Sequence, residues 1–111
     1  MDFQAAPAVV TATPTGFVAK LVGAIHTNTA WIEGEFKKII AAKPRDVELD
    51  LSETTFMSSS GIGLLVWLRS EVTQGGGAVR IVSIRKRLLT SLRYAHLDGV
   101  LDTTSTTVLP D

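Results

Sequence analysis

Three consecutive serines, Ser58, Ser59 and Ser60, stand where a largely apolar helix is predicted to begin. A serine in that place presents its hydroxyl near unsatisfied backbone N–H groups and the positive end of the helix dipole. Both features suit a phosphate group. The serines therefore indicate a plain N-terminal cap, which serine favours, or a phosphorylation switch whose added charge the fold tolerates and a partner senses. The two roles are compatible.

Two glycines follow the serines and suggest the start of a dinucleotide-binding fingerprint. The third glycine of that fingerprint is absent, because Val66 stands in its place, and no acidic residue follows at the proper distance. Gly61 and Gly63 are better explained if they let the start of the helix pack closely against a sheet. We therefore expect no nucleotide and no other cofactor.

A serine nucleophile for hydrolysis is also poorly supported. The nucleophile elbow needs a glycine two residues before the serine, where Ser59 has Met57 and Ser60 has Ser58. The chain has only two histidines, His26 and His96, and no cysteine, so it offers few bases and few metal ligands. We predict no catalytic residues and no metal site.

The pattern along the chain predicts strands that alternate with helices. Two β-branched runs, 8–13 and 17–22, flank a Pro-Thr-Gly turn and indicate a hairpin, with Gly23 ending the second run. A helix capped by Thr27 or Asn28 is expected to end at Lys43-Pro44. Its apolar positions at helical spacing are Trp31 or Ile32, then Phe36, Ile39 and Ile40.

The second half of the chain continues the alternation. A strand at Val47–Leu51 leads through a polar loop to the helix that starts at Ser59 or Ser60, runs to about Gln74 and stops at three glycines. The remaining predicted elements are a strand at 79–84, a helix with the apolar stripe Leu88, Leu89, Leu92 and Ala95, and a last strand at Val100–Leu101. The alternation predicts an α/β fold with a mixed central sheet of about 4–5 strands flanked by about 3–4 helices.

Four short motifs around the serines resemble the signature of the STAS domain family. They are Asp50-Leu51-Ser52, Phe56-Met57, Ser59-Ser60-Gly61 and Ile62-Gly63-Leu64-Leu65. The resemblance is specific across residues 47–68 and looser from Gly16 to Leu101. It implies a single STAS domain over residues 1–111. We expect a loosely ordered extension at 1–6 and a loosely ordered tail at 103–111, which is rich in threonine and ends with Pro110-Asp111. STAS domains commonly close with a further helix, which this sequence lacks.

The resemblance also implies a function. In anti-sigma factor antagonists of this family, the unphosphorylated form captures an anti-sigma factor that is a serine kinase, and this releases a sigma factor. Phosphorylation by that kinase ends the capture, and a phosphatase restores it. The phosphorylated position corresponds to Ser59, with Ser58 and Ser60 as alternatives, and Ser60 corresponds to a cap-like position. The implied partner-binding residues are His26, Ser58, Ser59, Ser60, Gly61, Ile62 and Val66.

The sequence departs from the family signature at two positions. Ser58 replaces the acid that usually precedes the phosphorylated serine, and His26 stands where switch proteins of the family often carry another acid. Both departures favour an alternative in which the chain is a scaffold or accessory subunit that is not phosphorylated. Such a subunit would belong to a stress-sensing assembly or a lipid-transport complex.

Composition narrows the remaining possibilities. The chain has 111 residues, which is the size of one domain, and its eleven basic and eleven acidic residues cancel. No net charge therefore attracts nucleic acid or an anionic membrane. The sequence shows no secretory signal at its start and no apolar run long enough for a membrane span. With no cysteine for disulfides, these features predict a soluble cytoplasmic domain.

Overall fold

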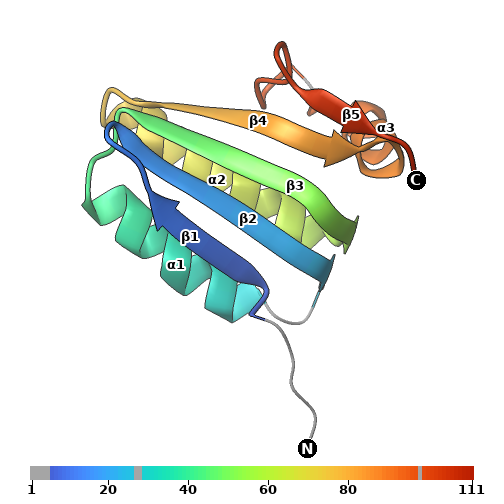
Figure 1. Ribbon diagram of the computed structural model, residues 1–111, viewed down its shortest axis with the longest axis horizontal. Coiled ribbons are helices and arrows are strands. Elements are labelled where there is room, and N and C mark those ends of the chain that lie inside the picture. Colours follow the sequence, from blue (N-terminus) through green and yellow to red (C-terminus); the bar gives the residue numbers. More distant parts are fainter. Residues whose placement is uncertain (1–5, 27–28, 98) are drawn as a thin grey trace, which may run out of the picture.

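A computed structural model describes residues 6–26, 29–97 and 99–111 of the chain. Within these ranges a five-stranded sheet in the order β1-β2-β3-β4-β5 packs with three helices (Figure 1). β1 pairs with β2 in antiparallel fashion, and the later neighbours are all parallel. The predicted α/β class with a mixed sheet is confirmed. The elements are β1 (Ala8–Ala12), β2 (Gly16–Ile25), α1 (Thr29–Ala41), β3 (Asp46–Met57), α2 (Ser59–Gln74), β4 (Ala78–Arg85), α3 (Lys86–Tyr94) and β5 (Thr107–Leu109).

The predicted hairpin is present as β1 and β2. The Thr13 N–H donates to the Gly16 carbonyl at 2.8 Å, and the Gly16 N–H donates to the Thr13 hydroxyl at 3.0 Å. The prediction that Gly23 ends the second strand is wrong, because β2 continues to Ile25. Gly23 has a φ of +83° and lies at an irregularity in the pairing with β3, so it bends the strand and does not stop it.

Helices α1 and α2 cover one face of the sheet and lie behind it in Figure 1. Their buried side chains form the core with the inward-facing residues of β2, β3 and β4. Of the two candidates for the first apolar position of α1, Ile32 is buried, whereas Trp31 is 55% exposed. Helical spacing explains this choice, because Ile32 lies one turn before the buried Phe36. The predicted cap at residues 27–28 and residues 1–5 of the predicted extension lie outside the described residues.

The opposite face of the sheet faces the viewer in Figure 1, and none of the described helices covers it. Alternation along β3 buries Val47 and Leu49 against the helices and places Glu48 on this open face. Glu48 pairs with Arg80 of β4 at 2.9 Å between Oε1 and Nη2. Lys20 forms an ion pair with Glu53, and the hydrogen bond and charge of Glu53 raise the pKa of Lys20. Both ion pairs thus lie on the open face, next to the exposed Val9.

The polar loop predicted after Leu51 is wrong, because β3 continues through these residues to Met57. The extension pairs with the end of β2 through two irregularities, with Thr54 opposite Gly23 and Met57 opposite Ile25. Thr54 is buried, and its hydroxyl donates to the Leu21 carbonyl at 2.8 Å. This long-range hydrogen bond satisfies a polar side chain that would otherwise favour a loop.

The predicted last strand at Val100–Leu101 is also wrong. Leu101 is buried, and the strand that pairs beside β4 is β5, which lies in the tail that we expected to be loosely ordered. β5 is held by pairing with Ser83–Arg85 and by a short hydrogen bond from the Thr106 hydroxyl to the Ile81 carbonyl. α3 lies beside β5 near the carboxyl end of β4 (Figure 1).

Candidate functional site

The carboxyl ends of β2 and β3 meet the start of α2 at one edge of the sheet (Figure 1). The Ser58 N–H donates to the Ile25 carbonyl at 2.8 Å, which joins the ends of the two strands. We name the surface made by His26, Phe56, Ser58, Ser59 and Ser60 the serine edge. Parallel strands bring their carboxyl ends to the same edge, and such an edge is a common place for binding sites in α/β sheets.

Ser58 is the N-cap of α2. Its backbone is extended, with a φ of −72° and a ψ of 170°, and its Oγ accepts a hydrogen bond from the Gly61 N–H at 3.2 Å. The expectation that Ser60 is the cap-like residue is wrong. Ser59 and Ser60 are the first two residues of the helix, and both are exposed. Ser58 therefore caps the helix, and Ser59 is exposed at the surface and has no part in the cap.

Loss of the cap has an expected cost. Ser58→Ala removes the side-chain oxygen that accepts from the Gly61 N–H in the first turn of α2, so the free energy of unfolding should fall by about 1 kcal/mol. Ser60→Ala is the matched control and should leave stability nearly unchanged, because the Ser60 side chain is exposed. Urea denaturation of both variants measures the difference. Equal stability of the two variants would contradict the assignment of Ser58 as the cap.

The two glycines of α2 have different surroundings. A Cβ atom at Gly61 would lie 2.7 Å from Met57 Cγ and 3.0 Å from Ile25 Cγ2, so this glycine lets the helix approach both strand ends. A Cβ atom at Gly63 would meet nothing within 4 Å, and Gly63 is exposed. The prediction of close packing is therefore confirmed for Gly61 and wrong for Gly63.

Sequence reasoning missed Phe56 as a surface residue of the serine edge. Its side chain is 53% exposed, and its ring centroid lies 6.4 Å from that of His26, with the two planes tilted by 56°. Together they present an aromatic surface just before the serines. Strict alternation along β3 would place Phe56 on the same side as the buried Thr54. An irregularity in the pairing with β2 falls between these two residues, so Phe56 is exposed, and the sequence carries no local signal for it.

Helix α2 extends the serine edge with apolar residues. Ile62 is half-buried and packs against the core, whereas Val66 is half-buried one turn further along the helix. The structure thus brings His26, Ser58–Gly61 and Ile62 together at one edge. Val66 lies beside them on the same helix. The first turn of α2 carries no acidic residue, so Ser59 has no carboxylate neighbour within it.

Among the described residues, no group of three or more His, Asp or Glu side chains is placed to hold a metal ion. None of the helices in the described ranges has the length and hydropathy to cross a lipid bilayer.

Comparisons with known proteins agree with the observed fold. The family model described as "STAS domain" matches residues 8–108. Among curated proteins, no sequence matches the chain. An anti-sigma factor antagonist from Mycobacterium paratuberculosis has a similar structure, with a TM-score of 0.75 and 21% identity over 86% of this chain and 81% of that chain.

Two further solved structures share the fold. The anti-sigma factor antagonist SpoIIAA in its unphosphorylated form has a TM-score of 0.71 and 16% identity, over 94% of this chain and 87% of that chain. The structure of SLC26A9 has a TM-score of 0.67 and 18% identity, over 87% of this chain but only 18% of that chain. At these identities the likeness is one of fold.

Proposed function

This chain belongs to the STAS domain family, and we propose that it is an anti-sigma factor antagonist that binds a kinase-type anti-sigma factor and is controlled by phosphorylation of Ser59. The observation that carries the proposal is the position of Ser59. It is exposed at the first residue of α2, next to the cap and inside an edge lined by aromatic and apolar side chains. The fold neighbours that are anti-sigma factor antagonists support the same role.

The physical basis of the switch is charge at a contact surface. A phosphate adds about −1.5 to −2 charges, and burial of such charge without a partner costs several kcal/mol. The N-terminus of α2 tolerates the phosphate within the free protein, because unsatisfied N–H groups and the helix dipole face it. Phosphorylation therefore weakens the complex without unfolding the domain.

Ser58 gives this switch an unusual form. An acid before the phosphorylated serine adds negative charge beside the hydroxyl and helps a kinase to orient it, whereas Ser58 is neutral and its hydroxyl is engaged by the Gly61 N–H. We expect slow phosphorylation of Ser59, so that the protein stays in its binding-competent form. A phosphatase completes the proposed cycle, and the domain itself has no catalytic role.

Ser58→Asp should accelerate phosphorylation of Ser59. Aspartate is as good an N-cap as serine, and an acid at a helix N-terminus is favourable by ~0.3–1 kcal/mol, so the fold should be retained. Intact-mass spectrometry with the partner kinase and ATP measures the rates, and peptide mapping locates the phosphate. Ser58→Asn controls for the shape of the side chain without its charge. Equal rates for wild type and Ser58→Asp would show that the missing acid has no regulatory meaning.

Capture from the native host tests the binding partner. The immobilised protein should recover an ATPase of the anti-sigma type, and the immobilised Ser59→Asp variant should recover much less of it. Recovery of components of a large assembly or a transport complex, equally by both forms, would favour the accessory subunit instead. The neutral Ser58, where the family usually has an acid, is the observation that favours an accessory subunit as the second candidate function.

A further inference from the structure

A shallow hollow lies between the end of β3 and helix α3. Its volume is about 100 Å³, and the buried side chains of Met57 and Leu88 form its base. We name it the Phe56 hollow and define it by its exposed residues, which are Thr55, Phe56, Arg87 and Ser91. Small-molecule sites usually have about 300–1,000 Å³. The hollow is therefore too small for a free ligand of that kind and suits a single side chain of a larger partner.

The Phe56 hollow is continuous with the serine edge, because Phe56 belongs to both. The Phe56 ring contacts His26 within the serine edge, with 6.4 Å between the ring centroids, and it lines the hollow together with Arg87 of α3. A partner that covers Ser59 and Phe56 therefore meets the exposed side chains of α3 as well.

The Arg87 guanidinium has donors available for a partner. Its side chain is 85% exposed, and among the described residues its ionic partner is Asp111, with 3.5 Å between Nε and Oδ2. Charge-assisted hydrogen bonds are shorter, at about 2.7–2.9 Å. Asp111 Oδ2 instead accepts from the Arg87 backbone N–H at 2.8 Å, so this carboxylate serves the start of α3. The guanidinium thus keeps its planar fork of donors, which matches a carboxylate.

Positive charge is concentrated at the start of α3. Arg85 is its N-cap, Lys86 and Arg87 are its first two residues, and its first turn has no acidic side chain. Cations in this place face the positive end of the helix dipole and are unfavourable. A position that breaks a local rule of folding is expected where function requires it. The three cations therefore favour an acidic partner.

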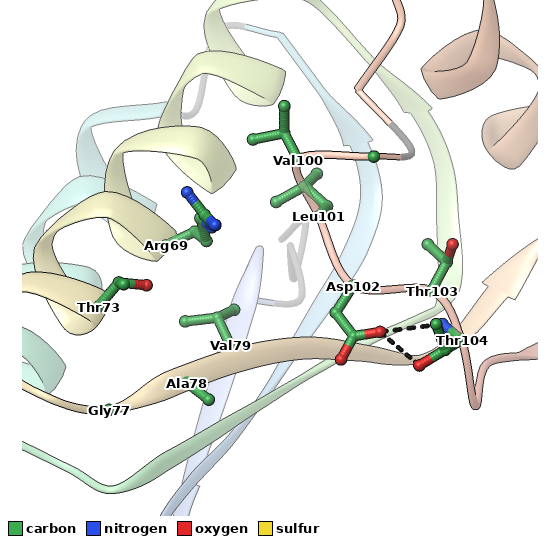
Figure 2. A pocket seen from close by; sticks show the side chains of 11 residues that line it. Arg69, Thr73, Gly77, Ala78, Val79, Val100, Leu101, Asp102, Thr103 and Thr104 are labelled. Carbon is green, nitrogen blue, oxygen red and sulfur yellow. Dashed lines mark hydrogen bonds between the residues drawn. The ribbon is translucent and has the colours of Figure 1, made fainter.

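A larger cleft of about 590 Å³ lies along the last turns of α2 and segment 99–104 (Figure 2). Its acidic residue, Asp102, accepts hydrogen bonds through Oδ1 from the Thr104 hydroxyl at 2.6 Å and the Thr104 N–H at 3.0 Å (Figure 2). These bonds, that of the hydroxyl first, lower the pKa of Asp102. The charge of Asp102 is therefore engaged within its own wall, whereas the charge of Arg87 is turned to solvent.

We propose that the Phe56 hollow and Arg87 bind an acidic segment of the anti-sigma factor. One apolar side chain of that segment occupies the hollow, and a neighbouring carboxylate pairs with the Arg87 guanidinium. This contact rests on the proposed function and extends the binding surface from the serine edge to α3. Opposite charge also raises the rate of encounter between the two proteins, and this contribution falls as salt is added.

Arg87→Gln should raise the Kd for the anti-sigma factor about tenfold, because a carboxylate of the partner loses its charged donor. The substitution keeps the backbone N–H from which Asp111 accepts, so α3 should remain folded. Arg93→Gln is the matched control, since it removes an exposed cation from the last turn of α3, outside the hollow, and should bind like wild type. Isothermal titration calorimetry with the anti-sigma factor captured from the native host measures each Kd. Added salt should weaken binding of wild type more than binding of Arg87→Gln.

Ser91→Glu tests the sign of the charge. Ser91 lies on the hollow one turn after Arg87, so a glutamate there pairs with Arg87 and repels an acidic segment. We expect a Kd at least about tenfold higher than that of wild type. Thr90→Glu adds the same charge at an exposed neighbouring position outside the hollow and should bind almost like wild type.

The outcomes distinguish this contact from the proposed function. Equal Kd values for wild type, Arg87→Gln and Ser91→Glu would overturn the contact at α3 and leave the antagonist role intact. Equal weakening by Arg87→Gln and Arg93→Gln would show a general effect of charge and would overturn the hollow as the site. Absence of binding by the wild-type protein would overturn both.

Discussion

Ser59→Asp is expected to weaken binding of the anti-sigma factor about 100-fold, which corresponds to ~2.7 kcal/mol. Ser59 is exposed at the first residue of α2, so its side chain meets a docked partner directly. A carboxylate placed there loses its hydration when the partner covers it, next to the aromatic ring of Phe56 and the apolar Ile62, and this desolvation weakens the complex. Isothermal titration calorimetry with the purified anti-sigma factor measures the change.

Three controls distinguish this charge effect from a structural one. Ser59→Asn has nearly the shape of the aspartate variant but no charge, and Ser59→Ala removes the hydroxyl, so both should bind with affinities close to wild type. The free energy of unfolding of Ser59→Asp should be unchanged or higher by ~0.3–1 kcal/mol, because the acid faces the helix N-terminus. Weak binding by the asparagine variant as well would show that shape matters and not charge.

Gly61→Ala is expected to lower the free energy of unfolding by ~1–3 kcal/mol, although alanine is the better helix former. The added methyl group would come within 2.7 Å of Met57 Cγ and 3.0 Å of Ile25 Cγ2, so the start of α2 must move away from both strand ends. Urea denaturation, with the midpoint and slope fitted together, measures the change. The same displacement should weaken partner binding, since it moves Ser59.

Gly63→Ala is the matched control, with the opposite sign. This glycine is exposed in the same helix and has open space where its Cβ would lie, so alanine should raise stability by ~0.5–1 kcal/mol. The two alanine variants thus distinguish the effect of packing at Gly61 from the effect of helix propensity, which both share. Equal changes in the two variants would mean that the close approach at Gly61 does not constrain the fold.

Local signals in the sequence predicted α2 and its surroundings well. Serines before an apolar run and glycines after it mark helix ends through contacts made within a few residues. The hairpin was predictable for the same reason, because Thr13 and Gly16 bond to each other. The sequence did not show which of the three serines caps α2. Ser58, Ser59 and Ser60 have the same chemistry, and only the backbone at Ser58 decides which of them caps.

Features that depend on distant partners were not predictable from the sequence. The polar residues after Leu51 resemble a loop. They nevertheless continue β3, because β2 pairs with them and its Leu21 carbonyl accepts a hydrogen bond from the Thr54 hydroxyl. β5 has three residues, and its pairing with β4 gives it its structure.

Release of a sigma factor tests the central claim most directly. The unphosphorylated protein is added to a preformed complex of the captured anti-sigma factor with its sigma factor, and the products are separated by size-exclusion chromatography. We predict that free sigma factor appears and that the anti-sigma factor co-elutes with this chain, whereas Ser59→Asp leaves most of the complex intact. A complex that stays intact with an excess of the wild-type protein would contradict the assignment of this chain as an anti-sigma factor antagonist.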